Sequence, residues 1–195
     1  MLNTFLTLFA RTLSEPRTVA AELINMRFER SSLWLALGLA AVLNAIAFQF
    51  SQLLTPSEIA LPIIFSSPVV FALLIAAGLA MSVYSFTFVG RFFGGTATLE
   101  GLMTLLIWLQ FMRFTVQVLA MVLVFIVPSL AGLLVLGASI YGMWLLIQFI
   151  DVAHAIESTF TSFGILVASG LAIMIGLAIL LTLLGVQNMG LTPYV

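Results

Sequence analysis

Residues 163–185 read FGILVASGLAIMIGLAILLTLLG, an apolar run without a single charged side chain. A helix needs about 20 such residues to cross the hydrocarbon of a bilayer, so this run has the length and composition of a membrane span. The rest of the chain continues the pattern, since 63% of its residues are hydrophobic and only 7% are charged. A soluble domain is about one quarter charged. The composition therefore indicates a chain that lies in lipid.

Unbroken apolar runs decide between the two structures that cross membranes. Backbone polar groups in hydrocarbon need internal partners, which leaves helices and closed barrels. Barrel strands alternate apolar and polar residues over about ten positions, whereas the runs here are continuous. We therefore expect an all-α polytopic integral membrane protein, a bundle of five transmembrane helices within residues 31–185. The expected spans are residues 32–54, 67–90, 99–127, 129–150 and 163–185.

Arginine placement predicts the orientation of these spans. Five of the six basic residues precede the first span or lie between the second and third: Arg11, Arg17, Arg27, Arg30 and Arg91. The segments expected on the opposite side, residues 55–66 and the tail 186–195, contain no basic residue. Basic loops stay in the cytoplasm. We therefore expect a cytoplasmic N-terminus and an extracytoplasmic C-terminus.

Residues 1–30 have the pattern of two amphipathic helices, with a restart at Pro16, a residue favoured in the first turn of a helix. The two apolar stripes consist of Leu2, Phe5, Leu6, Phe9 and Leu13, and of Val19, Leu23 and Met26. Such stripes are typical of helices that lie in the headgroup plane. We expect an interfacial anchor on the cytoplasmic side, with partner binding as the alternative.

Rows of small residues predict where the spans pack, because helices in lipid approach closely only where side chains are small. One row is in the fifth span, one in the second and one in the first. They are Gly164, Ala168, Ala172 and Gly176; Ala72, Ala76 and Ala80; and Ala36 and Ala40. We expect internal packing faces, with a homodimer face as the alternative.

A polar stripe in the third span is the strongest sign of a site. Arg113 lies near its middle, where a charged side chain costs about 3 kcal/mol and marks a functional position. Gln110 and Gln117 share its face, which we expect the helix to turn inward. The turn at Pro128 makes spans three and four antiparallel, which predicts Arg113 over the ring of Trp144. The whole expected seam is Gln110, Arg113, Gln117, Tyr141, Trp144 and Gln148. It either fixes helix register or receives an anionic or lipid ligand.

A second candidate site lies in the cytoplasmic loops. Asp151, His154 and Glu157 follow the fourth span at a spacing of three, which would align them on a helical continuation. Their side chains are competent metal ligands, although a solvated loop is the expected reading. Gly94 and Gly95 precede the third span and allow a tight helix start, with Thr96 or Thr98 as its cap. Backbone amides of such a loop also suit a phosphate, but capping explains the pattern.

Several classes of function are not expected. The chain has no cysteine, and its net charge of −1 gives no footprint for nucleic acid. No nucleophile elbow, phosphate loop or zinc-protease motif is present. We therefore expect neither an enzyme nor a cofactor or metal.

The chain resembles the Yip-domain family of membrane proteins, in particular its compact bacterial branch. The resemblance covers nearly the whole chain and rests on Ser14-Glu15-Pro16, on Phe93-Gly94-Gly95-Thr96, on the polar break after Phe149 and on the order of the five spans. It implies a five-helix membrane scaffold, and for a bacterial member the inner membrane. Eukaryotic members act in vesicle traffic through Rab-type GTPases. The long N-terminal segment and the Asp-Leu-Tyr-Gly-Pro-type motif of those members are not found here, so GTPase binding is not carried over.

Together these features predict a non-enzymatic scaffold or adaptor that binds membrane proteins, or a second copy of itself, through helix faces and cytoplasmic loops. The alternative is a small transporter or channel for an anionic or lipid ligand at the Arg113 seam.

Overall fold

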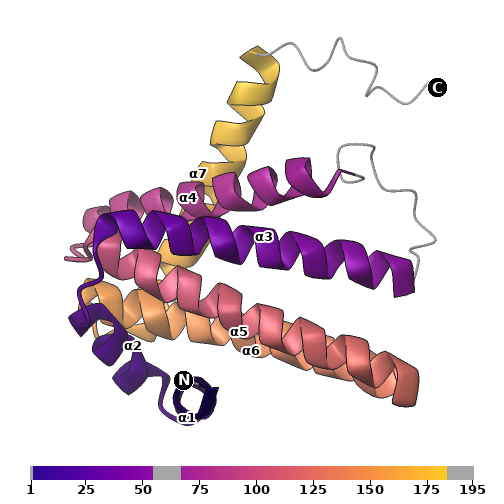
Figure 1. Cartoon of the computed structure of the whole chain (residues 1–195). Helices are drawn as coiled ribbons and strands as arrows, with labels where there is room; N and C mark the ends of the chain where they lie inside the picture. Colours follow the sequence, from indigo (N-terminus) through magenta and orange to yellow (C-terminus); the bar gives the residue numbers. More distant parts are fainter. Residues whose placement is uncertain (1, 55–66, 184–195) are drawn as a thin grey trace.

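Helices make up the part of the chain that the computed structural model describes, residues 2–54 and 67–183 (Figure 1). They are α1 (Leu2–Ser14), α2 (Pro16–Asn25), α3 (Arg30–Leu54), α4 (Pro68–Phe92), α5 (Leu99–Ile126), α6 (Pro128–His154) and α7 (Thr159–Leu183). The helices α3 to α7 are long and apolar enough to cross a membrane, which confirms the expected five-span, all-α fold. The expected tail, residues 186–195, lies outside the described residues.

Local sequence signals set the helix ends. Proline occupies the first turn of α2, α4 and α6, and only Val127 separates α5 from α6, as the expected hairpin requires. Thr98 caps α5 by accepting a hydrogen bond from the amide of Gly101 at 3.1 Å. The largest departures from the expected spans lie at the turn between α6 and α7: α7 begins at Thr159 instead of residue 163, and α6 continues to His154 instead of ending at residue 150. Asp151 and His154 are buried against other segments, so the helix outlasts its apolar run.

The five long helices form a ring. Contacts join α3 to α4, α4 to α7, α7 to α6, α6 to α5 and α5 back to α3. We call one end of this ring the basic end; there α3 begins at Arg30, and α4 turns into α5 after Arg91. The other end, where α5 turns into α6, is called the open end. Figure 1 shows α7 leaning away from α5 and α6 as it leaves the basic end.

The hydrophobic core gathers near the basic end. Its largest cluster is Leu33, Leu37, Leu79, Val83, Phe86, Ala97, Leu102, Met103, Leu106, Ile107, Ile150 and Ile165. Towards the open end, no α4 residue before Leu79 is buried, and Ser169 is the last buried side chain described in α7. Buried and exposed refer here to cover by the chain itself. The bundle is therefore closed at one end and spread at the other.

The two N-terminal helices lie outside the ring. The apolar stripe of α2 packs on α5 and α6: Val19, Ala20 and Leu23 form a second core cluster with Leu105 and Phe149. A headgroup-plane anchor would give this stripe to lipid, and that expectation is wrong for the buried part of α2. The stripe is apolar because it covers the bundle's own surface. The interfacial placement of residues 1–30 as a whole stays a prediction.

A salt bridge joins α1 to α2. Arg11 donates two hydrogen bonds to the carboxylate of Glu22, at 2.6 and 3.0 Å. Hydrogen bonding to Arg11 lowers the pKa of Glu22; partial burial acts in the opposite direction, and the charge of Arg11 acts in the same one. The same contact raises the pKa of Arg11. The two side chains are 39% and 41% exposed, so the bridge orients α1 more than it stabilises the fold.

The rows of small residues have different fates. In α3, Ala40 is buried and Ala36 is half-buried, so this row is the internal packing face that we expected. In α7, Gly164 and Ala168 are half-buried, whereas Ala172 and Gly176 are exposed. A Cβ built on Gly176 would have no neighbouring atom within 4 Å. The expectation of internal packing is therefore wrong for the outer half of the α7 row, because α7 leans out of the bundle.

Candidate functional site

Arg17 ties α2 to the end of α6. Its Nε donates to Oε1 of Gln148 at 2.6 Å, and its Nη2 donates to Oδ2 of Asp151 at 2.5 Å. A weaker contact of 3.4 Å joins Nη2 to the hydroxyl of Thr159 in α7. One guanidinium thus reaches both α6 and the first residue of α7.

Asp151 is the acceptor at the centre of this cluster. Its side chain is only 3% exposed, and its second oxygen, Oδ1, accepts from the amide of Ser158 at 2.9 Å and from the hydroxyl of Ser162 at 3.0 Å. A buried carboxylate is tolerated where a cation and hydrogen-bond donors surround it. Asp151 therefore fixes the turn from α6 to α7 and the place where α2 crosses it.

His154 closes the same end of the bundle from the other side. Its Nε2 lies 3.1 Å from the carbonyl oxygen of Phe86, and the amide of Ala97 donates to its Nδ1 at 3.4 Å. These two contacts require a neutral ring with its proton on Nε2. The ring is 1% exposed and holds α6 against both α4 and the segment before α5.

Two glycines make room for this ring. A Cβ on Gly90 would lie 2.1 Å from Cε1 of His154, and a Cβ on Gly95 would lie 2.2 Å from its Nδ1. Both distances are too short for a real side chain, so a glycine is needed at each position. Gly94 has another role, since its φ of 84° lies in the left-handed region and ends α4.

The backbone amides of the loop that was considered for phosphate binding already donate hydrogen bonds within the protein. The amides of Gly94 and Gly95 donate to the carbonyls of Arg91 and Gly90, and the amide of Thr96 donates to the carbonyl of His154 at 3.1 Å. The amide of Ala97 contacts the His154 ring. A bound anion would have to displace these bonds. The loop instead ends in the helix cap at Thr98 that the sequence predicted.

The three-residue spacing of Asp151, His154 and Glu157 does not bring these side chains together. The helix stops at His154, because Ala155 and Glu157 both have positive φ, at 52° and 57°. Asp151 faces Arg17 and His154 faces Phe86, while Glu157 is exposed. Among the described residues, no three His, Asp or Glu side chains are placed to hold a metal ion.

The expected seam between α5 and α6 is divided among other partners. Gln148 contacts Arg17, and the hydroxyl of Tyr141 donates to the carbonyl of Leu13 in α1 at 2.6 Å. Trp144 is 41% exposed, and its ring packs against Tyr141 with 5.2 Å between centroids. Two members of the α6 half of the seam therefore bond to α1 and α2. The sequence pattern missed this because the packing of α1 and α2 on α6 is not visible in the hairpin.

Arg113 lies on the face of α5 that we expected, but its side chain is not covered by other helices. It lies one heptad after buried Leu106 and one before buried Ala120, so it shares the stripe of α5 that packs inside the bundle near the basic end. Its own side chain is exposed. The expectation of an inward, covered guanidinium is wrong in this respect. Gln110 and Gln117 are half-buried, and the carbonyl of Gln110 accepts from Asn44 of α3 at 3.4 Å.

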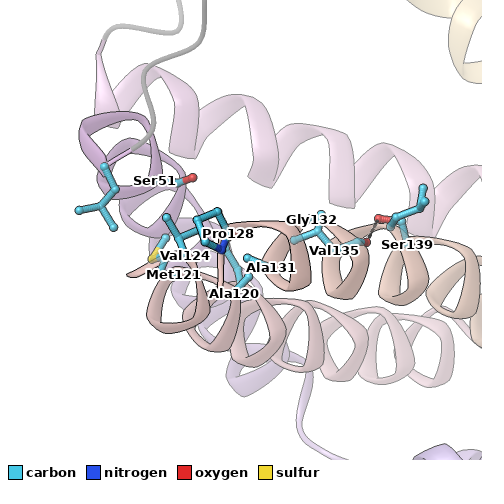
Figure 2. A pocket seen from close by; sticks show the side chains of 12 residues that line it. Ser51, Ala120, Met121, Val124, Pro128, Ala131, Gly132, Val135 and Ser139 are labelled. Carbon is cyan, nitrogen blue, oxygen red and sulfur yellow. Dashed lines mark hydrogen bonds between the residues drawn. The ribbon is translucent and has the colours of Figure 1, made fainter. Parts of the chain in front are cut away.

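A groove begins one helical turn beyond Arg113 and runs to the open end (Figure 2). Its volume is about 520 Å³. Residues of α3, α5 and α6 line it: Ser51, Leu54, Gln117, Ala120, Met121, Val124, Pro128, Ala131, Gly132, Val135, Leu136 and Ser139. The wall is apolar except for Gln117 and two serines. Gln117 lies one helical turn beyond Arg113 on the same face of α5, so it is the link between Arg113 and this groove.

Arg17 is the residue that sequence reasoning missed. The sequence places it only among the arginines that predict orientation, whereas in the fold it reaches partners 131 and 134 residues away. A conserved charge pair would be visible in many sequences, but a single chain contains no signal that joins Arg17 to Asp151.

The fold and these contacts define a polytopic α-helical membrane protein whose polar residues mostly join helices at one end. The family model for the Yip1 domain matches residues 10–181. The match covers nearly the whole chain, and the chain belongs to the Yip1-domain family. Neither a curated protein nor a solved structure matches the chain.

Proposed function

We propose that this protein is a non-enzymatic membrane scaffold that binds another membrane protein, or a second copy of itself, through the outer half of α7. The observation that carries this proposal is the uncovered part of the small-residue row, Ala172 and Gly176. Its inner half, Gly164 and Ala168, is partly covered within the bundle. The row is thus one packing face whose inner half contacts helices of this chain and whose outer half is left for a helix of another molecule.

The physical reason is the weakness of any other driving force between helices in lipid. Leucine gains nothing by leaving lipid tails, so association depends on close backbone approach at small residues. Ala172 and Gly176 are four residues apart and lie on one face. That face offers a partner helix a contact that the opposite face, with Met174, does not.

The basic end, where the bundle is closed, suits a scaffold. It joins α2, α4, α6 and α7 through Arg17, Asp151 and His154, so the rest of α7 projects from a fixed base. We assign the basic end to the cytoplasm, because arginines collect there, and for a bacterial chain this means the inner membrane. Catalysis is not part of the proposal, since the side chains of Asp151 and His154 are engaged in these contacts.

Site-specific photo-crosslinking in cells tests the proposal. A photoreactive residue at position 172 should capture one recurrent membrane protein or a second copy, and the same residue at position 174 should not. Gly176→Leu should abolish the capture while the purified protein keeps its helical content. Lipid adducts alone at position 172, with the same pattern at 174, would overturn the scaffold proposal.

A second candidate function, binding or transport of an anionic or lipid ligand, is favoured by Arg113. Among the described residues it has no ion-pair partner, and it lies about 21 Å along α5 from Leu99, near the middle of the span. A cation at that depth favours an anion. Arg113→Gln should then abolish ligand-dependent flux in vesicles, while Arg113→Lys retains part of it. Equal flux for all three forms would remove this candidate.

A further inference from the structure

A groove that the proposed function does not use lies at the basic end, between the N-terminal helices and the bundle. Its volume is about 450 Å³, within the range of small-molecule sites. It lies among α1, α2, α3 and α5. The lining residues are Phe5, Leu8, Leu23, Met26, Phe28, Ser32, Leu33, Ala36, Thr104, Ile107, Trp108 and Phe111.

The chemistry of the wall suits a hydrocarbon chain. All lining side chains are apolar except Ser32 and Thr104, and the hydroxyl of Thr104 already donates to the carbonyl of Glu100 at 2.8 Å. A helix about 10 Å across needs more room than this groove offers, whereas an acyl chain does not. The surrounding solvent of a membrane protein supplies such chains.

One wall of the groove is held in place by α1. The indole Nε1 of Trp108 donates to the hydroxyl of Thr12 at 3.1 Å, and Phe5 meets the Trp108 ring edge-on with 5.4 Å between centroids. Trp108 is about 14 Å along α5 from Leu99, so the groove extends into the leaflet at the basic end. A preformed groove loses less entropy on binding than one that must be built.

The mouth of the groove carries positive charge. Arg27 lies in the α2–α3 turn between the lining residues Met26 and Phe28, Arg30 is the first residue of α3, and both are exposed. Neither has an ion pair among the described residues, unlike Arg11 and Arg17, which are bound to carboxylates. Glu29 lies between them, which leaves one net positive charge.

The backbone adds to this charge. Leu33 makes the first helical bond of α3, to the carbonyl of Glu29, so the amides of the preceding turn have no partner within the helix. They lie at the positive end of the helix dipole. An anionic group at the mouth would therefore meet two guanidinium groups and a helix N-terminus directly above an apolar groove.

We propose that this groove binds one anionic phospholipid from the leaflet at the basic end. One acyl chain fills the space between Leu33 and Trp108, and the phosphate contacts Arg27 and Arg30. The site does not depend on the scaffold function of α7, which lies elsewhere in the ring.

Quenching of Trp108 fluorescence by lipids with brominated chains tests the proposal. The full chain with Trp34→Phe and Trp144→Phe retains Trp108 as its single tryptophan. In phosphatidylcholine vesicles with a minor fraction of brominated phosphatidylglycerol, quenching should saturate well below the level expected from bulk composition. Brominated phosphatidylcholine should show no such preference. Each arginine near the surface favours an anionic lipid about fivefold.

Matched variants separate headgroup from chain. Arg27→Gln with Arg30→Gln should bring the preference for the anionic lipid close to one, whereas Arg91→Gln at the end of α4 should leave it unchanged. Ser32→Phe should fill the groove and reduce quenching from both lipids, whereas the exposed neighbour Ser31→Phe should not.

Three results would overturn the proposal. The first is quenching that rises in proportion to bulk brominated lipid for both headgroups. The second is an equal effect of the Ser31 and Ser32 variants. The third is capture of a partner protein's helix at the groove, which would assign it to protein binding.

Discussion

The two ends of the bundle are built from the same apolar helices but are held by different forces. At the basic end, polar groups from distant segments meet: Arg17 of α2 contacts Asp151 of α6, and His154 of α6 contacts Phe86 of α4. At the open end, α7 leaves the bundle, and its small residues Ala172 and Gly176 have no cover.

This difference shows what specifies packing in lipid. Apolar side chains gain little by moving from lipid to protein, so apolar length alone does not close a bundle. Hydrogen bonds and ion pairs, which have no alternative partner in hydrocarbon, close it where they occur. The closed end is thus the rigid base of the molecule, and the open end is the part that is available to others.

Gly90→Ala tests the closed end most severely. The new Cβ would overlap the His154 ring, which is buried and held by contacts at both ring nitrogens, so we expect a loss of about 3 kcal/mol in the free energy of unfolding. Titration of the purified protein with SDS, followed by tryptophan fluorescence, measures this loss. Gly78→Ala on the same helix is the control, because no atom lies within 4 Å of its Cβ and alanine favours a helix. Similar stabilities for the two variants would contradict the close packing of the His154 ring against Gly90.

Asp151→Asn tests the ionic part of the same end. The amide retains an acceptor for Ser158 and Ser162 but removes the charge that Arg17 contacts, so we expect a loss of about 2 kcal/mol. Glu157→Gln, an exposed position just beyond the helix, should change stability by no more than about 0.5 kcal/mol. The same SDS titration compares them. An unchanged Asp151→Asn variant would show that the cluster does not hold α2 on α6.

The bridge between α1 and α2 should respond to pH with a smaller effect. The pKa of Glu22 is lowered by its hydrogen bond to Arg11, so this contribution is fully present above the ordinary glutamate pKa of about 4.3. It is lost as the pH falls through the lowered pKa of the folded state. The protection of the α1 amides, which is their exchange rate measured against the intrinsic rate at the same pH, should therefore fall at acid pH in the wild type. Glu22→Gln should exchange faster at neutral pH and lose this dependence; a wild type whose α1 exchange showed no acid response beyond that of the variant would contradict the bridge.

Gly176→Ala should have the smallest effect of the four on the isolated protein. Its Cβ meets no neighbour, and alanine is the better helix former, so stability should stay within about 1 kcal/mol of wild type. The SDS titration at low protein concentration measures this. A large loss would mean that the outer half of α7 is packed within the chain, and the contrast between the two ends would fail.

The candidate sites were predictable only where their chemistry is local. The turn at Gly94, the cap at Thr98 and the hairpin at Pro128 each depend on neighbouring residues, and the structure confirms the cap and the hairpin. The bonds of Gln148 and Tyr141 to α2 and α1 were not predicted, because α1 and α2 pack on α6 from outside the ring. Asp151 and His154 were singled out for their residue types, yet their partners lie in other helices.

The sequence by itself determined the solvent, the helical class and the five spans, because each of these depends on the composition and length of continuous segments. Tertiary structure alone decided that Arg17 pairs with Asp151, that two glycines enclose His154, and that α7 leaves the outer half of its small-residue row uncovered. These depend on the direction in which helices cross. In lipid, that direction is chosen by a few polar and steric contacts between residues far apart in the chain, and no local pattern records them.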